Sequence, residues 1–292
     1  MTAEDFSEKN IQLLKALTEL FEYVDIIIIN MLDNYKDAKA NGDYITIQTL
    51  YRLKIPRMLE EYSEQIVEKC LYLDSDVIVE GDITELFSID IGDCYIGGVR
   101  DAILSNEEMT DFKKQLGIPS LQNYINAGVL LFNPKKILED GKEKQLEEAA
   151  YKEDYRYNDQ DIINSILYSG IKVLPIKYNF MTAYLYHNKR ELIRKYGKSN
   201  LQDAMKNPLI VHYLSSTKPW TYRTSIRAEE WWKYANMQND GVIQKYIKPF
   251  VKKNTPSLFK VAEEMIDTVM KKIGVYDYIR SVYYSMRRVI LR

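Results

Sequence analysis

The pattern of apolar and polar positions along the chain predicts an α/β protein. Six apolar runs are short and rich in β-branched residues, as buried strands are, and they cover residues 24–30, 68–79, 94–101, 123–132, 171–181 and 208–220. Segments with apolar residues at helical spacing lie between them, at residues 2–21, 44–60, 134–140 and 157–170. Because strands alternate with amphipathic helices, we expect a mainly parallel sheet covered by helices.

Local signals predict where several helices begin and end. Asn133 precedes Pro134, and this pair is typical of a helix start, because asparagine caps free N–H groups and proline suits the first helical position. Asn158 is expected to cap the next helix in the same way, whereas Pro56 is expected to kink or end the helix predicted over residues 44–60. Beyond about residue 222 the pattern becomes helical and irregular. We therefore expect an α/β domain over residues 1–222 and a helical region over residues 223–292, and these are the predicted domains.

Polar side chains close several of the predicted strands. They are Asp74 and Asp76, Asp101, Asn126 and His212. In open α/β sheets, ligands bind beyond the carboxyl ends of the strands, so these residues are candidates for one site.

Asp74-Ser75-Asp76 is a candidate metal site. In a strand, residues i and i+2 point to the same face, and two neighbouring carboxylates repel each other unless a cation lies between them. Oxygen ligands at this position suit Mg²⁺ or Mn²⁺, and an added imidazole from His212 would favour Mn²⁺. Taken alone, a solvated strand end and a hydrogen-bonded structural histidine are simpler interpretations, so these residues leave the question open.

Two further segments carry candidate chemistry. Asp159-Gln160-Asp161 opens a predicted helix, where acidic residues are also common without a functional role. Arg52 stands on a helix that is otherwise apolar, and its guanidinium could bind a diphosphate in a bidentate manner or lie on the surface.

Composition and charge narrow the class of protein. With 46% hydrophobic and 28% charged residues, the chain has the composition of an ordinary globular protein. No stretch approaches the ~18 apolar residues of a membrane span, and two cysteines give no disulfide framework, so a reducing, cytoplasmic location is expected. From Lys245 onward eleven Lys or Arg stand against four acidic residues, a net charge of +7 that leaves −9 for the preceding residues, since the total is −2. This asymmetry argues against nucleic-acid binding and for one local anionic partner.

The basic C-terminal segment, residues 257–292, has apolar residues near helical spacing and three arginines at its end. A basic amphipathic helix suits the inner face of an anionic membrane. Packing against the domain or in a homodimer explains the same pattern equally well.

Five motifs in order give the chain a specific resemblance. "LYLDSDVIV", "YINAGVLLFNPKKI", "YNDQDIIN", "YNFM" and "HYLSSTKPW" resemble glycosyltransferase family 8 over about residues 1–222. That family includes glycogenin and bacterial galactosyl- and glucosyltransferases of lipopolysaccharide. The resemblance implies a GT-A fold and a retaining, Mn²⁺-dependent enzyme, with Mg²⁺ as the alternative ion. It also implies transfer of glucose or galactose from a UDP-sugar to a cell-surface glycan or lipid-linked acceptor.

The resemblance also implies roles for individual residues. Asp74, Ser75 and Asp76 match the metal- and nucleotide-binding motif, and His212 matches the third metal ligand. The residues matched to the diphosphate and the donor sugar are Lys218, Arg52, Asn126 and Ala127.

The remaining matched residues concern the reacting carbon and the acceptor. Asp159 and Gln160 match the pair at the reacting carbon, and Gln160 takes the place of the debated nucleophile. Asp101 is matched, less specifically, to the acceptor side. Ser215 stands where the family often has glycine, which weakens the backbone contact expected there.

One departure from the family concerns the start of the sequence. By comparison, about 35 residues that include a central strand and the uridine pocket would precede Met1, and a sheet without that strand exposes a hydrogen-bonding edge. We expect the sequence to be a truncated or mis-started version of a longer protein; alternatively, another segment fills the gap.

Two rival functions are compatible with the same residues. "YLDSDVIV" resembles the nucleophile motif of haloacid-dehalogenase-like phosphatases, with Asp74 as the nucleophile, but such an enzyme has no use for "NAG" or "HY…KPW". The other rival is an inactive relic or a carbohydrate-binding module, which the missing N-terminal strand would favour.

Overall fold

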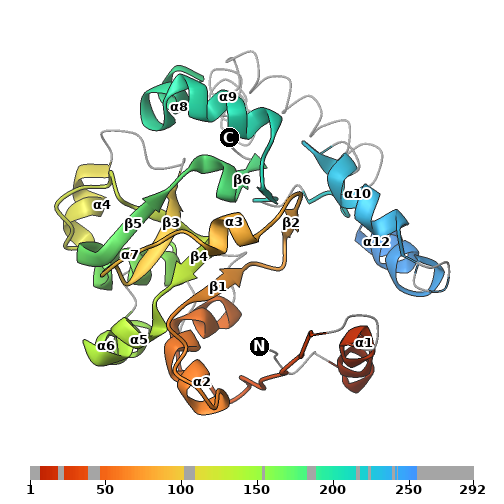
Figure 1. Ribbon diagram of the computed structural model, residues 1–292, viewed down its shortest axis with the longest axis horizontal. Coiled ribbons are helices and arrows are strands. Elements are labelled where there is room, and N and C mark those ends of the chain that lie inside the picture. Colours follow the sequence, from red (N-terminus) through yellow and green to blue (C-terminus); the bar gives the residue numbers. More distant parts are fainter. Residues whose placement is uncertain are drawn as a thin grey trace, which may run out of the picture. The chain divides into compact units, whose positions relative to one another are not determined.

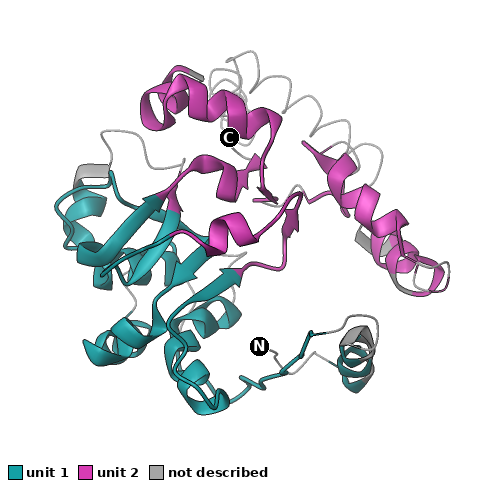
Figure 2. Cartoon of the chain, viewed as in Figure 1, with its two compact units in different colours: residues 1–72, 90–98, 106–173 teal, residues 73–89, 99–105, 174–292 magenta. Residues whose placement is uncertain are grey.

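The computed structural model forms two compact units (Figure 2). Unit 1 comprises residues 1–72, 90–98 and 106–173, and unit 2 comprises residues 73–89, 99–105 and 174–292. The structure describes residues 7–18, 23–38, 47–101, 109–152, 155–182, 189–214, 218–222, 225–238, 241 and 243–254.

Unit 1 is built on a four-stranded sheet (Figure 1). The strands, in their order across the sheet, are β1 (Cys70–Leu73), β4 (Ile125–Phe132), β3 (Ile96–Arg100) and β5 (Ile171–Leu174). Its helices are α1 (Glu8–Thr18), η1 (Ile47–Lys54), α2 (Ile55–Tyr62), α4 (Met109–Gln115), α5 (Pro134–Glu139), α6 (Lys142–Ala149), α7 (Asp159–Ile166) and η2 (Tyr168–Gly170). All eight residues of β4 are buried, so this strand runs through the centre of the unit.

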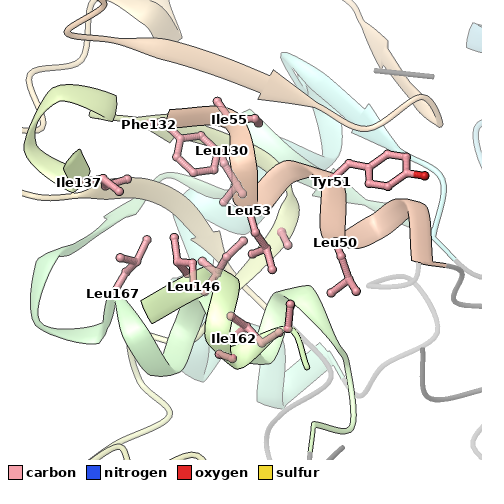
Figure 3. Close-up of a cluster of buried hydrophobic side chains, with 14 of the residues drawn as sticks. Leu50, Tyr51, Leu53, Ile55, Leu130, Phe132, Ile137, Leu146, Ile162 and Leu167 are labelled. Atoms are coloured by element: carbon pink, nitrogen blue, oxygen red, sulfur yellow. The ribbon is translucent and has the colours of Figure 1, made fainter. Parts of the chain in front are cut away.

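The core of unit 1 lies where η1, α6 and α7 pack together and α7 covers β4. Figure 3 shows side chains of all four elements meeting in this core, with Leu53, Leu130, Leu146 and Ile162 among them. Each is at most 1% exposed. Burying one such side chain stabilises the fold by about 1.5–3 kcal/mol, so β4 and α7 form a firm base for the polar side chains they carry.

Unit 2 contains a mixed three-stranded sheet in the order β2 (Val77–Val79), β7 (Ile210–His212), β6 (Phe180–Met181). β2 is antiparallel to β7 and places Val77 opposite His212, whereas β6 is parallel to β7. The helices among its described residues are α3 (Thr84–Phe87), η3 (Ile176–Asn179), α8 (Lys189–Tyr196), α9 (Lys198–Lys206), α10 (Ala228–Asn236), η5 (Ile243–Ile247) and α12 (Lys248–Asn254). None of the helices in the described ranges is both long and apolar enough to cross a bilayer.

Several predicted elements are confirmed. The strand at residues 94–101 is β3, and the strand followed by a helix over residues 123–140 is β4 and α5. The Asn133 side chain accepts a hydrogen bond from the Lys136 N–H at 3.1 Å, so it caps α5 as predicted. The predicted amphipathic tail, residues 257–292, lies outside the described residues.

The predicted strand at residues 24–30 is wrong. Residues 24–29 belong to no strand in the described part of the chain, and Asn30 forms an isolated bridge. Ile27 is 62% exposed. An extended apolar segment becomes a strand only where a second strand pairs with its backbone. Ile27 and Ile29 instead line a cavity of about 380 Å³ beside α2 and β1.

Two other predictions fail because the chain turns inside an apolar run. Residues 68–79 form β1 and β2, which belong to different sheets and are separated by a turn at Asp74-Ser75-Asp76. Residues 171–181 are divided by Pro175, which cannot donate a ladder hydrogen bond, and by η3. The segment predicted as one helix over residues 44–60 is divided next to Pro56: the 3₁₀-helix η1 ends at Lys54, and Pro56 lies in the first turn of α2, where helices tolerate the missing N–H.

Candidate active site

Asp74, Asp76 and His212 lie together in unit 2. His212 Nε2 is 3.3 Å from Asp76 Oδ1 and 3.9 Å from Asp74 Oδ2. One potential ligand atom from each residue lies within 4.8 Å of the other two. The His212 side chain is 2% exposed, whereas the side chains of Asp74 and Asp76 are 23% and 20% exposed. The imidazole is therefore buried, and solvent reaches the two carboxylates. This arrangement has the size and the donor atoms of a divalent metal site.

The backbone brings these three side chains together. The Tyr213 N–H donates to the Asp76 carbonyl at 3.0 Å, which extends the β2–β7 pairing to the turn that carries both aspartates. Asp74 and Asp76 therefore converge through this turn, and the strand alternation expected from the sequence is not the cause. Ser75 is exposed between them.

Asn179 orients the imidazole. Its Oδ1 lies 2.9 Å from His212 Nδ1, and both residues are buried. Because an amide oxygen only accepts, the Nδ1–H donates to it, and Nε2 is left to face the two carboxylates. Two carboxylates that face one point repel each other unless a cation or a proton lies between them, and together with the ring nitrogen they form a donor set that fits a divalent metal.

Lys218 contributes positive charge to the same cluster. Its ammonium contacts Asp76 Oδ2 and the Tyr213 carbonyl oxygen. Burial raises the pKa of Asp76, but hydrogen bonds and charge from His212 and Lys218 outweigh burial and hold that pKa well below its usual range. Asp76 is therefore ionised at neutral pH. Ser215, the other residue predicted near the diphosphate, lies outside the described residues.

Arg52 and Asp159 form a buried ion pair in unit 1. Arg52 Nε lies 3.1 Å from Asp159 Oδ2, and both side chains are 7% exposed. The guanidinium also donates to the Ala127 carbonyl at 2.6 Å and lies 4.6 Å from the centre of the Tyr72 ring. Arg52 is therefore not a surface residue, and it holds Asp159 beside the start of β4.

Gln160 joins the residues predicted to contact a donor sugar. Its Oε1 accepts hydrogen bonds from Asn126 Nδ2 at 3.1 Å and from the Ala127 N–H at 3.0 Å. The structure thus brings Asn126, Ala127, Asp159 and Gln160 together within unit 1. One expectation is corrected: Asn126 does not close an apolar run, because it is the second residue of β4. Asn126 lies near the other polar groups because Gln160, which is on α7, accepts a hydrogen bond from its side chain.

Sequence reasoning missed the polar residues that fasten α7 to β4. Asn164 accepts from the Ile125 N–H at 2.7 Å and donates to the carbonyls of Ile125 and Gln160, both at 2.8 Å. Asp161, which is fully buried, accepts from the Tyr124 hydroxyl. The sequence held a weak signal, since Asn164 lies one helical turn after Gln160.

The start of α7 also differs from the prediction. Asn158 occupies the N-cap position, but its side chain makes no capping hydrogen bond. Asp161, in the first turn of α7, instead reaches back to the segment before the helix, where its Oδ2 accepts from the Tyr157 N–H at 2.7 Å. Burial raises the pKa of Asp161, and the hydrogen bonds from Tyr124 and from the backbone of Tyr157 and Arg156 oppose that rise.

Asp101 directly follows β3 and belongs to unit 2. It is 2% exposed, and its carbonyl oxygen accepts from the Lys195 ammonium. Burial lowers the pKa of Lys195 to about 8; the charge of Asp101 opposes this and that of Arg100 adds to it. The predicted acceptor residue thus lies next to a lysine that loses its proton unusually early.

This lysine predicts a measurable pH dependence of stability. The pKa of Lys195 is about 8 in the folded chain and has the ordinary value of 10.5 in the unfolded chain. Between pH 8 and 10.5 the unfolded state therefore binds more protons than the folded state. Relative to Lys195→Met, the wild type should gain up to about 3 kcal/mol of unfolding free energy as pH rises from 8 to 10.5. Urea unfolding across this range measures it. Lys198→Met, at an exposed position, should leave the pH curve unchanged; parallel curves for wild type and Lys195→Met would contradict the prediction.

Comparison with known proteins identifies the family. The model of glycosyl transferase family 8 matches residues 1–224. The chain belongs to this family. Members typically use a divalent metal, and Asp74, Asp76 and His212 are a group that could hold one. The assignment also disfavours the haloacid-dehalogenase-like alternative, which the sequence motif alone left open.

Relatives in this family agree in sequence and fold. Glycosyltransferase GlyE of Streptococcus pneumoniae is 32% identical over 261 residues, which cover 83% of this chain and 57% of GlyE. A lipopolysaccharide 1,2-glucosyltransferase of Escherichia coli K12 is 32% identical over 158 residues, 53% of this chain and 44% of that protein. The chain thus spans about half the length of these curated relatives.

The solved structure of the galactosyltransferase LgtC, in complex with donor and acceptor sugar analogues, matches with a TM-score of 0.63. It is 28% identical, and the match covers 82% of this chain and 85% of LgtC. The α/β fold of this chain is therefore the GT-A-like fold of family 8, as predicted from the sequence.

Proposed function

We propose that the chain is a retaining glycosyltransferase that transfers glucose or galactose from a UDP-sugar to a cell-surface glycan or lipid-linked acceptor. The carrying observation is the cluster in which His212 Nε2 faces Asp74 and Asp76. Family membership supports the reaction class, and a galactosyltransferase and a glucosyltransferase among the similar proteins support a hexose as the transferred sugar.

In this proposal Asp74, Asp76 and His212 would hold Mn²⁺, because one nitrogen donor beside two carboxylates favours Mn²⁺ over Mg²⁺. When bound, the ion offsets the negative charge that develops on the departing UDP. Lys218 supplies a second positive charge at the same cluster and would stabilise the diphosphate as the sugar–phosphate bond breaks.

The residues at the start of α7 and β4 would orient the sugar. Asn126, Ala127 and Asp159 supply hydrogen-bonding groups, and Arg52 fixes Asp159 in place. Both acceptor positions of Gln160 Oε1 are already occupied by N–H donors, which disfavours its use as a covalent nucleophile. We therefore favour same-face attack by the acceptor hydroxyl, which forms the new C–O bond as the sugar–phosphate bond breaks and passes its proton to the departing phosphate.

Donor turnover tests the proposal. The full chain is incubated with UDP-glucose, UDP-galactose or GDP-mannose, in the presence of Mn²⁺, Mg²⁺ or EDTA, and released nucleotide is measured. We expect Mn²⁺-dependent release of UDP from one of the two UDP-hexoses, weaker release with Mg²⁺, and none with GDP-mannose or EDTA. If neither UDP-hexose binds or is hydrolysed with Mn²⁺, the proposal fails and the inactive or carbohydrate-binding alternative stands.

A further inference from the structure

A chain of buried hydrogen bonds runs from Asp161 to Gln160 through Tyr124. The Tyr124 hydroxyl donates to Asp161 Oδ1 at 2.5 Å, and Gln160 Nε2 lies 3.2 Å from the same hydroxyl oxygen. Tyr124 is 1% exposed and Asp161 is fully buried, so water does not compete at either group. The proposed reaction assigns neither Asp161 nor Tyr124 a role in binding the sugar or the diphosphate.

Backbone N–H groups determine which atom donates and which accepts in each of these hydrogen bonds. The Ala127 N–H can only donate, so the Gln160 atom 3.0 Å from it is the amide oxygen, and Nε2 must face Tyr124. Nε2 only donates, so the Tyr124 oxygen accepts and its own proton goes to Asp161. The Tyr157 N–H occupies the other Asp161 oxygen at 2.7 Å, which requires Asp161 to accept at both oxygens.

We propose that Tyr124 and Asp161 are positioning residues that, together with the Ala127 N–H, hold the Gln160 side-chain amide in one orientation at the reacting centre. This inference rests on the proposed function for its effect on the reaction, but the orientation itself depends only on these hydrogen bonds. A flipped amide would place Nε2 against the Ala127 N–H and leave two donors facing each other. Asp161 prevents this flip indirectly, because it keeps the Tyr124 proton away from Gln160.

Two variants of nearly unchanged shape test this orientation. Tyr124→Phe removes the acceptor for Gln160 Nε2 and should lower kcat about tenfold, with the donor KM changed by less than about twofold, because loss of orientation affects the reacting geometry more than binding.

Asp161→Asn should lower kcat further, by about 10- to 100-fold. An asparagine cannot accept from both the Tyr157 N–H and the Tyr124 hydroxyl. If its NH₂ turns to Tyr124, the tyrosine proton turns to Gln160 and favours the wrong amide orientation. The double variant should be less impaired than the product of the two single effects, because both act through the same hydroxyl.

Tyr95→Phe is the matched control. Its hydroxyl donates to Asp140 at 2.8 Å in the same unit, so the change removes another tyrosine–aspartate hydrogen bond that has no link to Gln160. We expect wild-type kcat and KM for this variant, and folding is checked for all variants by thermal unfolding.

An NMR measurement separates this inference from the proposed function. In chain labelled with ¹⁵N-glutamine, the Gln160 side-chain amide signal is assigned with Gln160→Ala. Tyr124→Phe and Asp161→Asn should both shift it, and Tyr95→Phe should not. Unchanged Gln160 signals in folded Tyr124→Phe and Asp161→Asn would overturn the inference, as would wild-type kcat for both in an active enzyme. If the wild type has no transferase or hydrolase activity, the proposed function fails, and the amide signals still decide the inference.

Discussion

Replacing Asp74 and Asp76 together by asparagine is expected to lower Mn²⁺-dependent UDP release at least about 10³-fold. Asparagine keeps the shape of each side chain but removes two negative charges that face His212 Nε2, and without them the site loses its attraction for a divalent cation. A bound metal supplies several kcal/mol of charge stabilisation, and each 1.4 kcal/mol corresponds to a factor of ten in rate. Initial rates across a Mn²⁺ titration measure the effect.

Asp82→Asn is the matched control for charge loss in the same unit. Asp82 lies on the surface shortly after β2, where its Oδ1 accepts from the Thr84 N–H at 2.9 Å, a role that asparagine keeps. Its activity should stay within twofold of the wild type. Titration of Mn²⁺ by calorimetry in the presence of UDP should show binding to this control and none to the Asp74→Asn, Asp76→Asn variant; a double variant that retains a tenth of the wild-type activity contradicts the metal assignment.

Replacing Arg52 by methionine is expected to lower the free energy of unfolding by about 3–5 kcal/mol. The change leaves Asp159 buried without the guanidinium charge 3.1 Å away and removes the donor to the Ala127 carbonyl. Breaking a buried pair from one side is more damaging than removing both charges. Arg52→Met with Asp159→Asn should therefore recover much of the loss, and equilibrium urea unfolding at pH 7 measures both variants.

Lys54→Met provides the comparison for this ion pair. Lys54 follows Arg52 on η1 and pairs with Glu147 at 3.7 Å, with side chains 25% and 35% exposed, so its loss should change stability by at most about 1 kcal/mol. An Arg52→Met variant no less stable than Lys54→Met would show that Asp159 is solvated or protonated in the folded chain.

Several residues of the candidate site could be predicted from the sequence, because they directly follow apolar runs that are typical of β-strands. His212 is more than 130 residues from Asp74 and Asp76 along the chain. The expectation that they meet rests on their positions at predicted strand ends together with the family resemblance. The structure brings them together, although by a turn that joins two sheets and not by alternation within one strand. Their role as metal ligands stays a prediction, which the Mn²⁺ titrations decide.

Long-range polar pairing could not be read from local patterns. Tyr124 and Asp161 are 37 residues apart, and Asn164 bonds to Ile125 over 39 residues. Periodicity reports which face of an element is buried, but it does not report which polar group on one element meets which group on another. The same limit explains the false strand at residues 24–30, since an apolar run does not specify whether a pairing strand exists.

The contact between Lys218 and Asp76 couples the binding of a cation at this cluster to the binding of an anion. An ammonium that already neutralises Asp76 competes with an incoming cation for the same carboxylate. A second anion that attracts Lys218 relieves this competition, so the cation and the anion each raise the affinity of the other by the same factor. We therefore expect this cluster to take up free metal weakly and metal together with a diphosphate strongly, which would link cation retention to the presence of nucleotide.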